Sequence, residues 1–276
     1  MNKFKNLRLE LIILVLFLIF TSLIVLGRRE KKVPEDIVEE ETVDSIKEID
    51  YTKIDVISGK YYYEDEHFSS SFGIDVSEFQ DDIDWKKVKN DSVEFAYLRI
   101  GRRGATTGLL YEDDKFEQNY KGAKENGLKI GVYFFSQAIN EKEAVEEAEW
   151  VIEHLKGKHL DLPVVYDCEE VFIEDEKPRL EGLEAKQLTD NALAFIKRIE
   201  KEGHECMIYT YLYWAENYFE MDRLTDYPFW FAQYDTDEPK LEYPIAIWQY
   251  SKNGTINGIS EPTDLNIMFI AKEENE

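Results

Sequence analysis

Two carboxylates follow an apolar, β-branched run in the segment 162–170, where Val164-Val165-Tyr166 leads into Asp167 and Glu169. The run is typical of a strand buried on both faces in a parallel sheet. Side chains alternate along a strand, so the two acids share one face, with Cα atoms roughly 6–7 Å apart. Two anions at this place cost free energy unless they are hydrogen-bonded or share a proton. That cost marks the pair as a candidate site for chemistry.

Further polar residues stand at or near the ends of other expected strands. The full set is Asp75, Arg99, Asp167, Glu169, Tyr209, Gln233, Gln249 and Asp264. In βα barrels the carboxyl ends of the strands carry the active site. One such residue carries no information, since every strand ends in something polar, but eight together, four of them acids, predict a functional site.

The elements that must position these residues alternate between apolar runs and amphipathic stretches. Strands are expected at 72–76, 93–100, 129–135, 162–167, 206–211, 229–233, 245–249 and 265–269. Helices are expected near 84–88 and at 115–126, 141–156 and 185–202, with a short one at 214–219. The alternation predicts an α/β fold with parallel pairing. The connections 234–244 and 250–263 contain proline and glycine, so an eight-stranded irregular barrel with helices reduced in its C-terminal half is expected.

The chain before residue 71 has a different composition. Residues 1–10 form a short basic tail, and residues 11–27 form an uncharged stretch at the short edge of what spans a bilayer. This stretch is interpreted as a signal anchor in the cell membrane, with the domain outside. Cleavage as a signal peptide, which would give a secreted protein, is the alternative. Residues 28–70 read as an acidic tether and residues 71–276 as the catalytic domain.

The net charge of −25 argues against nucleic acid as a partner. It is compatible with a neutral polymer such as a glycan. Cys168 and Cys206 do not make a disulfide framework, and the four histidines lack zinc-ligand spacing. No metal or cofactor is expected, and the protein is expected to be a monomer.

Several motifs in one order carry a resemblance to a known family. They are Gly73-Ile74-Asp75-Val76-Ser77, Asp84-Trp85, Phe95-Ala96-Tyr97-Leu98-Arg99, Gly131-Val132-Tyr133-Phe134-Phe135, Asp167-x-Glu169, Tyr209-Thr210 with Trp214, Phe229-Trp230-Phe231-Ala232-Gln233-Tyr234, Trp248-Gln249-Tyr250 and Asp264-Leu265-Asn266. From Phe72 to Phe269 the chain resembles the family 25 glycoside hydrolases, muramidases (lysozymes) that cut peptidoglycan. The resemblance implies an irregular βα barrel and cleavage of β-1,4 bonds between N-acetylmuramic acid and N-acetylglucosamine.

The resemblance also implies roles for individual residues. Glu169 matches the general acid, Asp75 and Asp167 match acids that flank the scissile sugar, and Asp264 matches an aspartate at the rim. The residues expected to bind substrate are Asp264, Arg99, Tyr133, Tyr209, Gln233 and Trp248. Where the family often has K-x-[S/T]-E-G, this chain has Arg99-Ile100-Gly101-Arg102-Arg103-Gly104, which leaves the substrate contacts of that loop open.

Several of these residues have a second interpretation. Arg99 is either a substrate contact or a cation that neutralises the acids, and Gln233 and Gln249 either meet substrate or satisfy backbone groups at the barrel mouth. The aromatic residues either stack on sugars or fill the core. Glu169 needs a raised pKa to act as acid, for which repulsion from Asp75 and Asp167 is the expected cause.

The chemistry and the function also keep alternatives. The sequence leaves open whether the substrate's acetamido group or an activated water attacks the anomeric carbon. The alternative functions are a non-catalytic glycan-binding module on the same barrel and a membrane-tethered scaffold.

Overall fold

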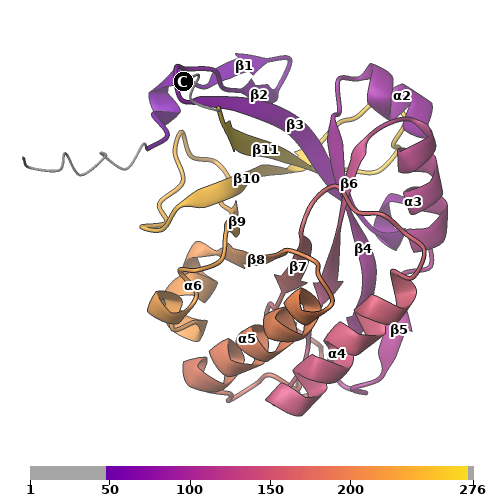
Figure 1. Cartoon of the computed structure of the whole chain (residues 1–276), viewed down its shortest axis with the longest axis vertical. Helices are drawn as coiled ribbons and strands as arrows, with labels where there is room; N and C mark the ends of the chain where they lie inside the picture. Colours follow the sequence, from indigo (N-terminus) through magenta and orange to yellow (C-terminus); the bar gives the residue numbers. More distant parts are fainter. Residues whose placement is uncertain (1–47, 273–276) are drawn as a thin grey trace, which may run out of the picture. The chain divides into compact units, whose positions relative to one another are not determined.

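The computed structural model describes residues 48–272, and these form a closed barrel of eight strands (Figure 1). The barrel strands are β3 (Phe68–Val76), β4 (Phe95–Arg103), β6 (Lys129–Phe135), β7 (Val164–Asp167), β8 (Cys206–Tyr211), β9 (Phe229–Ala232), β10 (Ile245–Gly254) and β11 (Thr263–Ala271). Seven of them run parallel, and pairing of β3 with β4 closes the ring. The predicted eight-stranded irregular α/β barrel is confirmed.

Strand β11 breaks the parallel pattern, because it pairs antiparallel with both β10 and β3. The connection 255–262 between β10 and β11 is too short to hold the crossover helix that a parallel pair would require. Strands β10 and β11 are also longer than predicted, and register shifts in β10 interrupt their pairing. A short strand, β5 (Leu110–Glu112), is added antiparallel to the end of β4. Strand β5 is not among the predicted strands.

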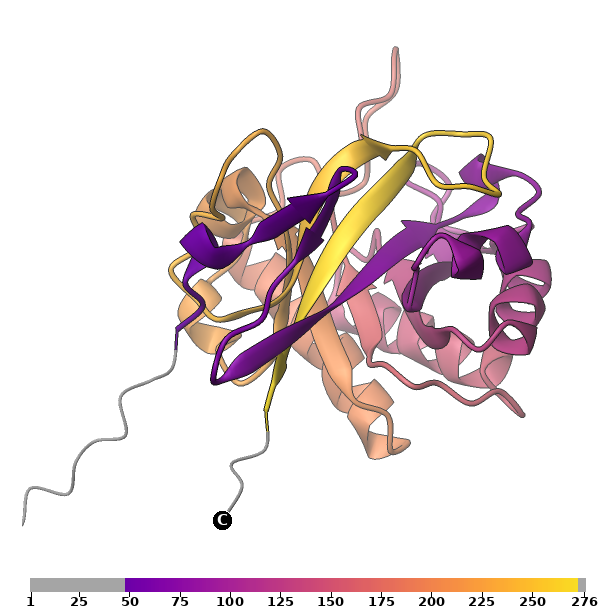
Figure 2. The ribbon, with the colours of Figure 1, turned by 90° about the horizontal axis from the view of Figure 1, so that it is seen from above.

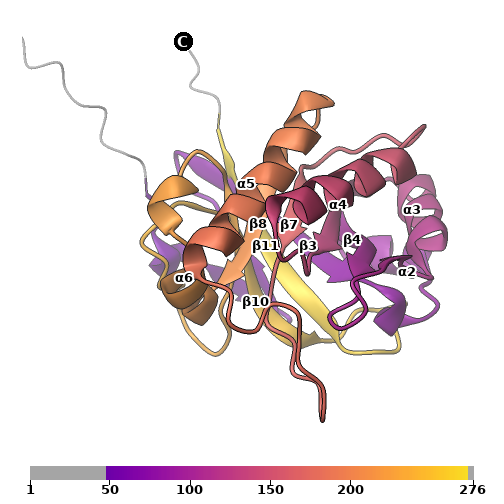
Figure 3. The same ribbon diagram turned by 90° about the horizontal axis from the view of Figure 1, so that it is seen from below.

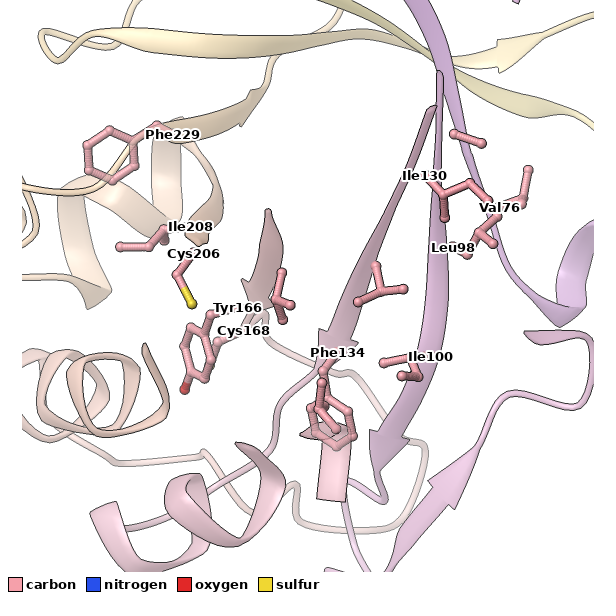
Figure 4. Close-up of a cluster of buried hydrophobic side chains, with 14 of the residues drawn as sticks. Val76, Leu98, Ile100, Ile130, Phe134, Tyr166, Cys168, Cys206, Ile208 and Phe229 are labelled. Atoms are coloured by element: carbon pink, nitrogen blue, oxygen red, sulfur yellow. The ribbon is translucent and has the colours of Figure 1, made fainter. Parts of the chain in front are cut away.

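The helices are α2 (Trp85–Asn90), α3 (Phe116–Glu125), α4 (Glu141–His154), α5 (Ala185–Lys201) and α6 (Leu212–Tyr218), with single 3-10 turns η1 (Tyr51–Lys53), η2 (Glu78–Gln80) and η3 (Met221–Arg223). The α-helices cover the outer face of the parallel strands. Phe195 of α5, for example, packs on Phe134 and Tyr166, with ring centroids 6.3 and 5.1 Å apart. Figure 4 shows part of this apolar layer.

The barrel interior holds a second, smaller cluster of large side chains, including Phe95, Tyr97 and Trp230. Two glycines make room for these rings. A Cβ at Gly73 would lie 2.3 Å from the ring of Phe95, and one at Gly131 would lie 2.2 Å from the ring of Tyr97. The amino end of the barrel is therefore filled with aromatic side chains, and the polar residues lie toward the other end.

A hairpin of β1 (Asp55–Ile57) and β2 (Lys60–Tyr62) covers the barrel where helices are missing, beside β3, β10 and β11 (Figure 2). The ring of Tyr61 stacks on Tyr250 at 3.9 Å, and Tyr51 meets Trp248 and Phe269 edge-on. Residues 48–70, which the sequence analysis assigns to the tether, thus contain regular structure that packs on the barrel.

Residues 48–272 contain no helix that is both long and apolar enough to cross a membrane. The tail at 1–10, the expected anchor at 11–27 and the tether up to residue 47 lie outside the described residues. Their assignments stay predictions.

Candidate active site

Four carboxyl groups meet at the carboxyl end of the barrel. Asp75 lies near the end of β3, directly opposite Asp264 of β11 in the antiparallel register. Asp167 is the last residue of β7, and Glu169 follows two positions later. In Figure 3 the segment between β7 and α5 extends outward from the barrel, at the bottom of the view. The structure therefore brings together the four acids that the sequence singled out.

Asp75 is almost fully buried and receives two amide hydrogen bonds on one oxygen. Gln249 Nε2 donates to Oδ2 at 2.9 Å, and Asn266 Nδ2 donates to the same atom at 2.8 Å. Burial raises the pKa of Asp75 to about 6, although both amides and Asp264 lower it. Burial, together with the charge of Asp75, raises the pKa of Asp264 to about 8. At neutral pH Asp264 therefore carries a proton and donates it to an ionised Asp75.

Asp167 and Glu169 form a second carboxyl pair. Burial raises the pKa of Glu169 to about 7, and burial also raises the pKa of Asp167 well above its ordinary value. Asp167 Oδ1 is buried and has no hydrogen-bond partner among the residues described, and the side chain of Glu169 is in hydrogen-bond contact with Asp167. Two such groups titrate as a pair, and each favours its protonated form more than an ordinary carboxyl does.

The cause of the raised pKa of Glu169 differs from the expected one. Burial contributes most, the charge of Asp75 adds to it, and the contact with Asp167 lowers the pKa instead of raising it. The pKa of Asp167 is raised as well, mainly by burial and by the charge of Glu169.

The backbone of this pair is held by the residues that follow β6. Ser136 N–H donates to the carbonyl oxygen of Asp167 at 2.7 Å, and Gln137 Nε2 donates to the carbonyl oxygen of Glu169 at 2.9 Å. Glu169 lies beyond the end of β7, where the ladder with β6 and β8 has stopped. The amide of Gln137 therefore fixes Glu169 where strand pairing no longer does.

A buried ion pair stabilises the segment that follows β6, which in turn holds the backbone of Asp167 and Glu169. Glu147 of α4 is fully buried, and it accepts hydrogen bonds from Arg103 Nε at 2.7 Å and Ser136 Oγ at 2.6 Å. Gln137 N–H adds a longer bond of 3.3 Å. Burial raises the pKa of Glu147 to about 7. The carboxyl of Glu147 thus orders the segment that holds Asp167 and Glu169.

Arg99 lies beside the acids, but its guanidinium is occupied. Nε bonds Asp113 Oδ2 and Nη2 bonds Glu78 Oε1, both at 2.8 Å, and the side chain is nearly buried. Its charge lowers the pKa of Asp167. These contacts favour the interpretation of Arg99 as a neutralising cation over that of a direct substrate contact.

The aromatic and amide residues that were predicted to bind substrate lie in two places, inside the barrel and on its outer side. Tyr133 and Tyr209 both lie edge-on to Trp230 inside the barrel, and Tyr209 bonds Gln249 Oε1 at 3.2 Å. Trp248, in contrast, packs on the outer side against the N-terminal segment and donates its indole N–H to the Gln233 carbonyl oxygen at 2.8 Å.

The Gln233 side chain accepts a hydrogen bond from the backbone of Lys240. This contact holds the loop that follows β9. Neither Trp248 nor Gln233 is therefore placed with the acids, contrary to the expectation.

Two residues at the site were not predicted to bind or act there. Asn266 is fully buried and bridges Asp75 to Trp230, whose indole N–H it accepts at 2.8 Å. Tyr234 donates to Gln249 Oε1 at 2.5 Å. The signal for Asn266 is in the sequence, because an amide two positions after Asp264 in an apolar strand must point to the same face.

Paired carboxyl groups with raised pKa values at the carboxyl end of a βα barrel are the arrangement that a glycoside hydrolase uses. Within that class the chain belongs to the glycosyl hydrolases family 25, whose family model matches residues 74–259.

The chain is similar to curated proteins and to a solved structure. It is 30% identical over 194 residues to an autolytic lysozyme of Clostridium acetobutylicum, covering 70% of this chain and 54% of that protein. It is 30% identical over 203 residues to lysozyme M1 of Streptomyces globisporus, covering 70% and 66%. A modular autolysin of Streptococcus pneumoniae, solved with a synthetic peptidoglycan ligand, shares the fold with a TM-score of 0.67 at 24% identity, over 78% of this chain and 51% of that one. The chain thus spans about half the length of the first relative.

Proposed function

We propose that this protein is a peptidoglycan hydrolase that cleaves the β-1,4 bond between N-acetylmuramic acid and N-acetylglucosamine. The observation that carries the proposal is the pair formed by the buried Asp167 and the partly buried Glu169 at the mouth of the barrel, both with raised pKa values. The similarity to two proteins named lysozyme supports this substrate class.

Glu169 is the proposed general acid. Glycoside cleavage needs a proton on the leaving oxygen while an oxocarbenium-like centre forms at the sugar. A pKa of about 7 keeps much of Glu169 protonated near neutral pH and still lets it release that proton. Asp75, held by two amide donors, supplies negative charge that is compatible with the developing positive centre.

The contact between Asp167 and Glu169 favours attack by the substrate's own acetamido group. Two carboxyl groups that act across a sugar are about 5–5.5 Å apart in retaining enzymes and about 6.5–9.5 Å apart in inverting ones. A pair in hydrogen-bond contact fits neither spacing. Asp167 is therefore proposed to orient and polarise the acetamido group, with retention at the anomeric carbon as the expected outcome. Nuclear magnetic resonance of the first-formed anomer separates this route from attack by water, which would invert the centre.

Membrane anchoring through residues 11–27 is part of the proposal. The supporting observation is the uncharged stretch itself, which follows a short basic tail and precedes a polar segment. Such an arrangement holds the barrel at the outer side of the bacterial membrane, next to the wall. Fractionation of cells that express the full chain tests it, and recovery of a shortened protein from the medium would indicate cleavage instead.

The activity is tested with purified bacterial walls and the full chain. Falling turbidity with new muramic acid reducing ends, identified by mass analysis, is the expected result. New N-acetylglucosamine reducing ends would indicate the other glycosidic bond. Binding to walls without cleavage would identify a glycan-binding module, and neither binding nor cleavage would leave the scaffold interpretation.

A further inference from the structure

The mouth of the barrel is flanked on one side by three exposed apolar side chains that the catalytic acids do not require. Phe79 of η2 is 70% exposed, Leu109 is 60% exposed, and Tyr111 of β5 is 38% exposed. We call the two aromatic residues, Phe79 and Tyr111, together with the neighbouring Leu109, the aromatic ridge. We propose that the aromatic ridge binds sugar units of the glycan strand beyond those at the cleaved bond, by stacking their apolar faces on the two rings. This inference rests on the proposed function.

The Phe79 ring is held rigidly although it is exposed. The Arg99 guanidinium lies over one face of the ring, with Cζ 4.9 Å from its centroid. Arg99 itself is nearly buried and is fixed by Asp113 and Glu78. A ring fixed from beneath loses little conformational freedom when a ligand covers its other face, which favours binding.

The Tyr111 ring is held in the same way. It lies directly opposite Arg102 in the antiparallel pairing of β4 and β5, and Arg102 Cζ is 5.5 Å from its centroid. Arg102 bonds Glu78 Oε1 at 2.6 Å, the same oxygen that Arg99 contacts. One carboxylate therefore fixes both cations under both rings.

The two rings belong to one rigid unit. The backbone N–H of Glu78, next to Phe79, donates to Asp113 Oδ2 at 3.0 Å, and Asp113 follows β5 directly. Asp113 is buried and also accepts the bond from Arg99. Segments far apart in the sequence, 78–80 and 110–113, are thus joined by hydrogen bonds that do not depend on a ligand.

The charges of this region favour a neutral ligand. Arg99 and Arg102 are balanced by Glu78 and Asp113 through three short contacts, so the guanidinium groups beneath the rings already pair with carboxylates of the protein. Exposed flat rings without free charge match the apolar face of a pyranose ring, as they match other flat partners.

The ridge is continuous with the catalytic acids. Arg99 lies on the same side of β4 as Tyr97, which is opposite Asp75 in the pairing with β3. The charge of Arg99 also reaches Asp167. A glycan strand that leaves the acids on this side of the mouth therefore meets Phe79 first and the β4–β5 hairpin next. This hairpin is where the chain departs from the family pattern, so the ridge gives that segment a role.

The test compares long glycan strands with a tetrasaccharide of the same repeat, using the full chain and variants of the ridge. Phe79→Leu keeps apolar volume but removes the flat face, and Phe79→Tyr keeps the face. Phe79→Leu and Tyr111→Leu are each expected to raise KM for long strands about fivefold, the range of one aromatic contact. The increase for the tetrasaccharide is expected to be smaller, and Phe79→Tyr is expected to restore the KM of the parent.

The matched control is Ile57→Ala, which removes an apolar side chain of similar exposure from β1, outside the mouth. It is expected to change neither KM. Equal losses on long and short substrates, or no change for both ridge variants, would overturn the inference. If the parent protein cleaves neither substrate, the proposed function fails instead. Thermal unfolding of each variant separates a folding defect from lost binding.

Discussion

An acid at the barrel mouth has two consequences: it lowers the stability of the fold when it ionises, and it can supply a proton to the leaving group. Replacing Glu169 by glutamine separates these two effects. Burial gives Glu169 a pKa of about 7, against 4.5 for an ordinary glutamate. Such a group holds its proton more tightly in the folded than in the unfolded state. Its contribution to stability is therefore complete below about pH 4.5 and is lost as the pH rises through 7. The difference in pKa corresponds to about 3 kcal/mol.

Glutamine cannot ionise, so Glu169→Gln is expected to avoid this loss. At about pH 8 the free energy of unfolding of the variant is expected to exceed that of the parent by about 3 kcal/mol, or roughly 6–12 °C in Tm for a domain of this size. At about pH 4 the two proteins are expected to unfold at nearly the same temperature. Lysis of walls is expected to fall by about 100-fold or more, because the proton donor is gone. Calorimetry at both pH values and a turbidity assay measure the two effects.

The matched control is Glu170→Gln, which removes the adjacent, exposed carboxylate. It is expected to leave lysis and the pH dependence of Tm nearly unchanged. An equal gain of Tm at pH 4 and pH 8 for Glu169→Gln would refute the raised pKa. Substantial residual lysis by this variant would remove Glu169 from the role of acid.

Three further predictions concern the neighbours of this residue. Lysis is expected to follow a bell-shaped pH profile, since Asp75 ionises above about 6 and Glu169 loses its proton above about 7. Initial rates at constant ionic strength measure it, and a flat profile between about pH 5 and 8 contradicts both assignments. Asn266→Leu removes a donor that lowers the pKa of Asp75, so the acid limb of that profile is expected to move to higher pH while the alkaline limb stays. An unmoved acid limb would mean that another group titrates there. Arg103→Met leaves Glu147 buried without its cation, which is expected to cost about 3–5 kcal/mol at about pH 8. The cost is expected to be much smaller at about pH 5, where Glu147 keeps its proton, and urea unfolding that gave equal costs at both pH values would contradict this account.

The sequence was sufficient for the features that depend on local pattern. Strands at 129–135 and 206–211 were predicted with the bounds that the structure has, because each is a continuous apolar run between polar breaks. The position of the acids at strand ends was also visible. Since the carboxyl ends of parallel strands meet at one edge, Asp75, Asp167 and Glu169 had to converge once the parallel barrel was predicted.

The direction of individual side chains in the C-terminal half was decided only by tertiary structure. Trp248 and Gln249 are adjacent, and one points to the outer layer while the other bonds Asp75. Which of the two faces the acids depends on pairing with β9 and β11 and on a register shift in β10, none of which is a local property.

The partners of the charged groups were likewise decided by the fold. Arg99 is directed to Glu78 and Asp113, and Glu147 is buried against Arg103, through contacts between segments 14 to 44 residues apart. The sequence determined that acids gather at the mouth of a barrel. The tertiary structure determined which of them have raised pKa values and which are paired with a cation, because burial and contact set the pKa of each acid and both arise only when distant segments pack together.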